Sequence, residues 1–346
     1  MSPKPVCGLM SKFHIIRSAA SPACRATGLG LVLSLWLATV SLTGVPAHSA
    51  SYPERTIKVV IGAAAGAGGD TMIRLLAQGL SEKWQQPVIV ENRSGGSGLI
   101  SANEVLKSPA DGYTLYVSND SPAINPNVME RMPFDYGEVF KPVSLLVLID
   151  FKLLVRPDLP VKTVADLITL TRSKPGELSF ASAGTFTSHH LISERFNVMA
   201  GLNAVHVPFR GAVPALNSLM AGHTDYAFTG FTGTGGLIEG GQLREIATTG
   251  IRRNEATPQL PTIGETLPGF SAYSWFAMWT RSEVPEAIRA KVANDVKTVM
   301  NSAAILNRLS SVGMEAVGSS PEELSRFHNR EREKWADLPA SVLRPK

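Results

Sequence analysis

The fold is organised around one stretch, Val59-Val60-Ile61-Gly62-Ala63-Ala64-Ala65-Gly66-Ala67-Gly68-Gly69-Asp70. The apolar run that ends at Ile61 predicts a short buried strand, and Ile73, Leu76 and Leu80 recur at helical spacing further on. A loop of small residues that leads into a helix leaves backbone N–H groups accessible at the positive end of the helix dipole. The stretch therefore predicts either an anion seat or a tight strand-to-helix connection that binds nothing.

Residues 1–49 have the features of a signal peptide. An apolar stretch runs from Leu29 to Leu42, and Ala47-His48-Ser49 fits the small-x-small rule for signal peptidase. The basic residues that precede the apolar stretch are Lys4, Lys12, Arg17 and Arg25. At about fourteen residues, the apolar stretch is shorter than the roughly twenty that a membrane-spanning helix needs. We expect export by the general secretory route and cleavage near Ser49, with translation starting at Met1 or Met10.

Removing this leader changes the composition of the chain. The full sequence has 33 Lys and Arg, 29 Asp and Glu, and a net charge of +4. Without the leader's four basic residues, 29 positive charges face 29 negative ones, so a basic surface for nucleic acid or membrane is not expected. Both cysteines, Cys7 and Cys24, leave with the leader. The mature chain therefore has no disulfide and no thiol for catalysis or metal binding.

A repeating strand–helix pattern continues after the opening stretch. Residues 87–90 predict a second buried strand, 99–106 a helix and 113–117 a third strand. This β-α-β-α-β order predicts a parallel sheet covered by helices. The polar cluster 118–121 follows the carboxyl end of the third strand, which is where ligands collect in open α/β sheets. We expect it to share a crevice with the Gly/Ala loop.

The pattern restarts after the apolar run 143–155, which predicts one strand into the middle of the protein and a continuation out of it. The later elements are predicted as helix 163–170, strand 178–181, a helix after the loop 182–188, strand 205–209, a helix that begins near Pro214, strands 225–229 and 244–248, and helices 285–300 and 321–335. The aromatic run 273–279 fits either a core segment or a return strand, and its pattern alone favours core.

Catalytic and metal motifs fail at specific positions. Thr71 stands where a dinucleotide-binding loop needs its third Gly, no Lys-Ser/Thr follows the loop, and Leu99 replaces the last Gly of a nucleophile elbow. His189 and His190 are adjacent and lack the i, i+4 spacing of a zinc helix. His189 follows the 182–188 loop and can reach a ligand there. Asp70 is predicted to cap its helix and fix the loop, with contact to a ligand's amino group as the alternative.

Several stretches together resemble one family in order and spacing. They are Tyr52-Pro53-Glu54-Arg55-Thr56-Ile57, Val90-Glu91-Asn92-Arg93-Ser94-Gly95-Gly96-Ser97-Gly98, Pro109-Ala110-Asp111-Gly112-Tyr113-Thr114-Leu115, Ile124-Asn125-Pro126, Ala181-Ser182-Ala183-Gly184-Thr185, His206-Val207-Pro208-Phe209-Arg210-Gly211 with Pro214-Ala215, and Gly241-Gln242-Leu243-Arg244. Over nearly all of residues 52–340 the chain resembles the Bordetella uptake gene family, the extracytoplasmic solute-binding receptors of tripartite tricarboxylate transporters.

The resemblance implies an α/β type II periplasmic-binding-protein fold, with two βαβ lobes joined by two crossover strands. Residues 50–152 and 273–346 would form lobe 1, and 153–272 lobe 2. The crossovers would fall on 143–155 and 273–279, which makes the aromatic run a hinge strand. A small organic acid would lie in the cleft, held by backbone amides and small hydroxyls of both lobes.

The resemblance also implies which residues bind the ligand. In lobe 1 they are Ala64, Ala65, Gly66, Gly68, Asp70 and Ser118. In lobe 2 they are Ser182, Ala183, Gly184, Thr185 and Ser188, with His189, Gly211, Pro214, Ala215 and Asp225 as further candidates. We expect no catalytic residue, cofactor or metal, and no nucleic acid as a partner. The resemblance implies a monomer in the periplasm, and its partners would be a small and a large membrane subunit.

The chain departs from the family at the seat itself. Members usually carry a loop close to Pro-Phe-Pro-Pro-Gly-Gly, where this chain has Gly62-Ala63-Ala64-Ala65-Gly66-Ala67. Because proline fixes φ, we expect this loop to be more mobile before binding. The acid itself stays open among mono-, di- and tricarboxylates and amino or aromatic acids. The alternatives are a sensory receptor that presents its ligand to a signalling partner, and an exported α/β enzyme that uses Asp70, Asp225 or His189.

Overall fold

The computed structural model describes residues 52–230, 232–254 and 257–343, so the predicted signal peptide lies outside the described residues. The first part of the chain forms β1 (Ile57–Ile61), α1 (Gly68–Trp84), β2 (Val88–Asn92), α2 (Leu99–Leu106), β3 (Thr114–Ser118), α3 (Ser121–Val128), α4 (Tyr136–Val139) and β4 (Phe140–Asp150). The first three strands lie where the sequence pattern predicted them.

The middle of the chain repeats the alternation. It contains β5 (Lys152–Val155), α5 (Val164–Ser173), β6 (Ser179–Ser182), α6 (Ser188–Ala200), β7 (Val205–Pro208), α7 (Ala212–Met220), β8 (Tyr226–Thr229), α8 (Gly235–Glu239) and β9 (Arg244–Thr248). The last part contains β10 (Tyr273–Arg281), α9 (Glu286–Met300), α10 (Ala303–Ser310), β11 (Glu315–Ala316), α11 (Pro321–Ala336) and α12 (Ala340–Leu343).

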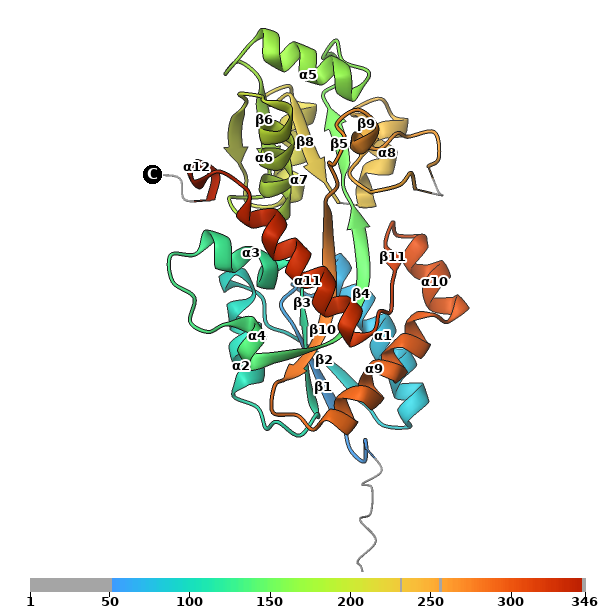
Figure 1. The fold of residues 1–346 in the computed structure, drawn as a ribbon. Helices are drawn as coiled ribbons and strands as arrows, with labels where there is room; N and C mark the ends of the chain where they lie inside the picture. Colours follow the sequence, from blue (N-terminus) through green and yellow to red (C-terminus); the bar gives the residue numbers. More distant parts are fainter. Residues whose placement is uncertain (1–51, 231, 255–256, 344–346) are drawn as a thin grey trace, which may run out of the picture. The chain divides into compact units, whose positions relative to one another are not determined.

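The strands form two sheets with the same internal order (Figure 1). The first sheet has the order β11-β4-β10-β3-β1-β2, with β1 parallel to β2 and β3 and with β10 antiparallel to β3 and β4. The second has the order β7-β6-β8-β5-β9, with β6 parallel to β7 and β8 and with β5 antiparallel to β8 and β9. In each sheet, a strand from another part of the chain inserts beside the third parallel strand. This is the expected type II periplasmic-binding fold, with one sheet in each of two lobes.

The two lobes are joined by the predicted crossovers. β4 belongs to the first sheet and β5 to the second, with Phe151 between them, and β10 returns to pair with β4 from Tyr273↔Asp150 to Arg281↔Phe140. The aromatic run is therefore a return strand. Its sequence pattern alone had favoured a core segment, and that interpretation was wrong. Trp275, Ala277 and Met278 are nevertheless fully buried, which explains that pattern. The lobe boundaries at 152/153 and 272/273 stay a prediction.

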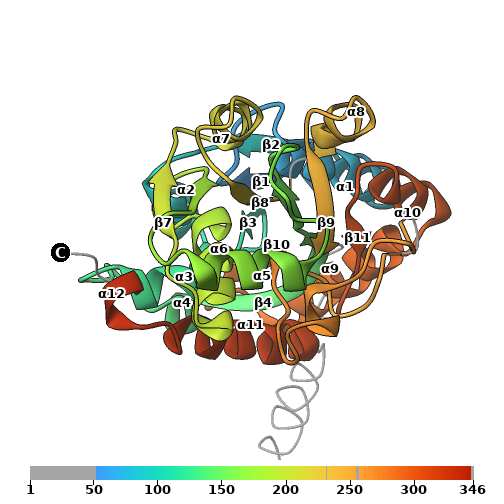
Figure 2. The same ribbon diagram turned by 90° about the horizontal axis from the view of Figure 1, so that it is seen from above.

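The C-terminal helix α11 provides a further contact between the two lobes, in addition to the two crossovers. α11 packs along β4, as the view from above shows (Figure 2). Near its end, the backbone carbonyl of Lys334 accepts a hydrogen bond of 3.2 Å from Arg195 of α6. In the described part of the chain, no helix has the length and apolarity needed to cross a bilayer.

α1 forms because its apolar residues share one face. Met72, Ile73, Leu76, Leu80 and Trp84 are all buried, at the spacing of a 3.6-residue helix. This face packs against the first sheet and α9, so the helix is held by its core contacts. Its first residue follows an extended Ala67 that offers no side-chain cap. The N-terminal turn is thereby fixed in space while its backbone donors stay uncapped.

Candidate functional site

Asp70 fixes the loop before α1 instead of facing outward. Its carboxylate, with 4% of the residue exposed, accepts hydrogen bonds from the Gly66 amide at 2.8 Å, Asn92 Nδ2 at 2.8 Å and Arg74 Nε at 3.0 Å. Burial alone raises the pKa of Asp70, but the hydrogen bonds from Arg74, Gly66 and Asn92 outweigh it and hold the pKa below its ordinary value. The carboxylate is therefore charged and holds the loop, as predicted. The predicted capping role was wrong, because Ala67 is the N-cap and Asp70 lies inside the first turn of α1.

The first backbone amides of α1 are the donors that remain. Within the described residues, the N–H groups of Gly68 and Gly69 donate no hydrogen bond. Gly69 lets the ring of Phe276 approach the backbone closely, because a Cβ atom there would lie 2.4 Å from Cζ of Phe276 and would force the ring to shift. The ring of Phe276 thus covers one side of the turn, and Gly68, Gly69 and Phe276 all line the space beside it.

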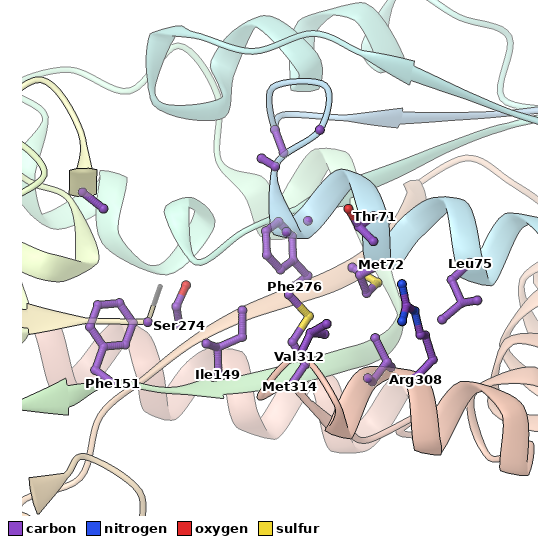
Figure 3. Close-up of a pocket in the computed structure, with 18 of the residues that line it drawn as sticks. Thr71, Met72, Leu75, Ile149, Phe151, Ser274, Phe276, Arg308, Val312 and Met314 are labelled. Atoms are coloured by element: carbon purple, nitrogen blue, oxygen red, sulfur yellow. The ribbon is translucent and has the colours of Figure 1, made fainter. Parts of the chain in front are cut away.

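That space is a cavity of about 520 Å³, which we call the first cavity (Figure 3). Its volume falls within the range of roughly 300–1,000 Å³ that is usual for small-molecule sites. Its lining residues are Ala63, Gly66, Ala67, Gly68, Gly69, Thr71, Met72, Leu75, Ile149, Phe151, His189, Ala212, Gly230, Ser274, Phe276, Arg308, Leu309, Val312 and Met314. Lobe 1 therefore supplies most of the walls, and three residues of lobe 2 close the opposite side.

A second cavity of about 320 Å³ adjoins the first. Its lining residues are Ser97, Asn119, Asp120, Ser121, Ile124, Asn125, Ala183, Phe186, Thr187 and Ser188, together with Phe151, His189, Ser274 and Phe276, which also line the first cavity. The polar cluster after β3 thus lies beside the loop after β6. The sequence predicted that this cluster and the Gly/Ala loop share a crevice, and the two cavities meet at the four shared residues.

A short hydrogen bond joins the lobes in the second cavity. Ser188 Oγ at the start of α6 donates to Oδ2 of Asp120 at 2.5 Å. Burial raises the pKa of Asp120 to about 6, although the hydroxyls of Ser188 and Ser274 act in the opposite direction. The buried carboxylate is therefore mostly ionised at pH 7 and is held by hydroxyl donors.

His189 stands at the junction of the two cavities. Burial lowers its pKa to about 4, so its imidazole is neutral at pH 7. The ring stands edge-on to Phe151, with centroids 5.0 Å apart, and its Nε2 atom is buried without a hydrogen-bond partner among the described residues. A neutral imidazole can donate or accept one hydrogen bond there. It can therefore contact a ligand without adding charge.

The structure brings together only part of the predicted site. Gly66, Gly68 and His189 line the first cavity, and Ala183, Ser188 and His189 line the second. The predicted residues that line neither cavity, although they belong to adjoining loops or to the first turn of α7, are Ala64, Ala65, Gly184, Thr185, Gly211, Pro214 and Ala215. Ligand contact by these residues stays a prediction.

Two of the predicted serines are engaged elsewhere. Ser118 Oγ accepts a hydrogen bond of 2.8 Å from Trp279 Nε1, and Ser182 Oγ lies 2.7 Å from His206 Nε2. Both residues are almost completely buried, and neither lines a cavity. They hold the strand ends in place, so their hydroxyls are not directed at the cavities.

Asp225 lies at the wrong end of its strand for the predicted role. It precedes β8, and its carboxylate accepts hydrogen bonds from Arg156 Nε at 3.0 Å and the Ser179 amide at 2.8 Å. β6 and β8 are parallel, so Asp225 marks their amino ends, whereas the cavity-lining loop 183–188 follows the carboxyl end of β6. We therefore remove Asp225 from the proposed site.

Most residues that line the two cavities were not predicted as ligand contacts, and four of them are informative. Phe151 and Phe276 lie in the crossover segments, where the sequence signal was apolarity alone. Asp120 belonged to the polar cluster but was not singled out. Arg308 has no local signal, because α10 brings it to α1 from more than 200 positions away in the sequence. Among the described residues, no group of three or more His, Asp or Glu side chains is arranged to hold a metal ion.

Comparison with known proteins decides the family. Residues 72–341 match the model of the tripartite tricarboxylate transporter family receptor. The chain belongs to this receptor family. It is also 29% identical to Protein BugT of Bordetella pertussis over 315 residues, which cover 90% of this chain and 96% of BugT. The resemblance to the Bordetella uptake gene receptors is confirmed, and the chain is a solute-binding receptor.

Two solved structures of Rhodopseudomonas palustris proteins share the fold. Rpa4515 with adipate is 32% identical, with a TM-score of 0.74 and with 84% of this chain and 98% of that chain covered. MatC with bound malate is 26% identical, with a TM-score of 0.70 and with 83% of this chain and 99% of that chain covered. Both ligands are small dicarboxylates bound by those proteins.

Proposed function

We propose that this receptor captures a small carboxylic acid between its lobes and releases it unchanged, without catalysing a reaction. The observation that carries the proposal is the pair of glycines Gly68 and Gly69 at the positive end of α1, whose amides donate no hydrogen bond within the described residues and which both line the first cavity. The acids held by Rpa4515 and MatC support the ligand class. Each charge-assisted hydrogen bond to a carboxylate contributes about 1.5–3 kcal/mol.

The lobe 2 side supplies further donors for the acid. Ser188 and His189 begin α6, and Ala212 begins α7, so two more helix N-termini approach the cavities. Closing the lobes around the ligand by a hinge at the crossover strands would remove water from these donors. Removal of water strengthens each polar contact because the local dielectric falls.

A ligand screen tests this function. Thermal unfolding of the mature chain with mono-, di- and tricarboxylates should give a rise in Tm with at least one acid. The acid should be recovered chemically unchanged after incubation. Stabilisation by sugars or cations and by no acid would contradict the proposal, and conversion of a bound acid into a product would favour an enzyme.

We further propose that the mature receptor works as a monomer in the periplasm and delivers its ligand to a small and a large membrane subunit. The leader pattern of residues 1–49 and the family's transporter role support this arrangement. Cell fractionation should place the chain, shortened near Ser49, in the periplasmic fraction, and light scattering should give the mass of one chain. Retrieval of membrane transport proteins with the ligand-loaded receptor would support delivery, whereas retrieval of a signalling protein would favour a sensory role.

A further inference from the structure

The first cavity is apolar along most of its length. Beyond the amides of Gly68 and Gly69, the walls are formed by the side chains of Met72, Leu75, Ile149, Leu309, Val312 and Met314. Figure 3 shows Met72 of α1 facing Val312 and Met314 across the cavity. A carboxylate seat that continues into such walls suits a ligand with an apolar body.

The polar and apolar parts follow each other along α1. Gly68 begins the helix and Leu75 lies seven positions further, which at 1.5 Å per residue is roughly 10 Å along the axis. The cavity therefore leaves space for an extended body behind a carboxylate held at the first turn. A short, highly polar acid would leave this length unfilled.

Arg308 does not change the apolar character of the wall. Its side chain extends from α10 toward α1 at an exposed position (Figure 3), and the structure shows no ion pair to it within the described residues. An exposed guanidinium keeps most of its water, and ion pairs at such positions contribute little. By contrast, a second carboxylate placed against Met72 or Leu75 would lose part of its water and, among the described residues, would find only the exposed guanidinium of Arg308 as a nearby charged partner.

We propose that the receptor selects an amphipathic carboxylic acid, with the carboxylate at the α1 amides and an extended apolar chain or ring along Met72, Leu75 and Val312. This inference rests on the proposed function, because it assumes that an acid is the ligand. The inference adds a basis for selectivity among acids: the apolar walls, and not a second charged group, determine which acid binds most tightly.

Titration calorimetry of the mature chain with butanoate, hexanoate, octanoate and 3-phenylpropanoate tests the inference, with malate and adipate for comparison. Affinity should increase by about fourfold for each added methylene until the cavity is filled, since burying one methylene is worth about 0.8 kcal/mol. Octanoate or 3-phenylpropanoate should bind more tightly than malate. Equal affinity across the series, or tightest binding of malate, would overturn the inference and leave the proposed function intact. Binding of none of these acids would also overturn the inference, and the thermal screen with mono-, di- and tricarboxylates would then decide whether the proposed function stands.

A matched pair of variants locates the effect. Leu75 is a half-buried wall residue, and Leu306 on α10 is 39% exposed and lines neither cavity. Leu75→Asn should weaken octanoate about tenfold while butanoate changes little, and Leu306→Asn should change neither. Equal losses for the two acids in Leu75→Asn would contradict the inference. Val312→Ser provides an independent wall variant, and the unmodified chain gives the dependence on chain length without any substitution.

Discussion

Ser188 Oγ donates a hydrogen bond of 2.5 Å to Asp120 Oδ2 and so connects the start of α6 to the loop after β3. The two residues belong to different sheet-containing lobes and line the same cavity. The loops that follow the parallel strands of both sheets thus meet directly. The contact joins the two surfaces that must separate when a ligand enters or leaves.

Replacing Asp120 with Asn tests the electrostatics of this contact. Burial raises the folded-state pKa of Asp120 from 3.8 to about 6, so between these pH values the folded chain holds a proton that the unfolded chain has lost. Asp120 therefore stabilises the fold relative to Asn at low pH and loses this contribution as pH rises through about 6. The free energy of unfolding of wild type minus Asp120→Asn, measured by urea denaturation from pH 4 to 8, should fall by about 2–3 kcal/mol. A difference that does not change with pH would contradict this assignment.

The buried side chain of His189 should give the free energy of unfolding the opposite dependence on pH. Burial lowers the pKa of His189 to about 4, so between about pH 4 and 6.5 the unfolded chain binds a proton that the folded chain does not. Stability should therefore fall as pH is lowered through this range. Between pH 7 and 4.5, the free energy of unfolding should decrease by about 2 kcal/mol less in His189→Gln than in the unmodified chain, as measured by urea denaturation. The exposed His223→Gln serves as the control and should retain the loss; identical profiles for the two variants would exclude His189 as its source.

Gly69→Ala tests whether the first turn of α1 is the carboxylate seat. The added Cβ would lie 2.4 Å from Phe276 Cζ, so the ring must shift away from the turn, and this changes the shape of the cavity that Phe276 and Gly69 both line. We expect ligand affinity to fall at least about tenfold, the equivalent of one lost hydrogen bond to a charged group, with an unchanged circular dichroism spectrum. Gly236→Ala is the control, because nothing lies within 4 Å of its added Cβ. Retained affinity in Gly69→Ala would remove this turn from the site.

Asp70→Asn distinguishes a loop-fixing carboxylate from one that contacts a ligand amino group. The substitution weakens the hydrogen bonds from Gly66, Arg74 and Asn92, so stability should fall by about 1–3 kcal/mol in chemical denaturation. Affinity should fall by the same factor for an amino acid and for the same acid without its amino group. A loss confined to the amino acid would show that Asp70 faces the ligand.

Arg308→Gln tests the minor role of the exposed cation. Because exposed charge pairs contribute about 0–1 kcal/mol, affinity for any acid should change by no more than about fivefold. The association rate should fall more at low salt than at high salt, since a charge at the rim mainly steers encounter. Stopped-flow measurements at two ionic strengths check this, and a much larger loss for dicarboxylates alone would assign Arg308 a direct contact.

The sequence was most informative where structure is local. The apolar spacing of Ile73, Leu76 and Leu80 is a property of one helix face, and it predicted α1. The order of strands and helices predicted the parallel strands β2-β1-β3, and its repeat matches β7-β6-β8; the antiparallel strands that complete each sheet were not predicted by this pattern. The family resemblance supplied the two crossovers. The pattern also placed residue 225 at the start of a strand, which is correct. The ligand-binding role of Asp225 was assigned only because the family resemblance implied it.

The details of the site depend on contacts between distant segments. Ser118 and Ser182 are the last residues of β3 and β6, where ligand-binding hydroxyls are expected, but their hydroxyl groups are hydrogen-bonded to the side chains of Trp279 and His206. The apolar wall of the first cavity exists only because the segment 308–314 packs beside α1. No local pattern predicts such packing, because it depends on the tertiary arrangement of the C-terminal helices.

Identification of the ligand that co-purifies with the natively folded mature chain tests the central claim most directly. Mass spectrometry of the protein under native conditions and of the released small molecules should find one carboxylic acid per chain. Adding this acid back to refolded, ligand-free protein should restore the higher Tm, and the acid should be recovered unchanged. A bound sugar or metal ion in place of an acid, or an acid that the protein converts, would contradict the account.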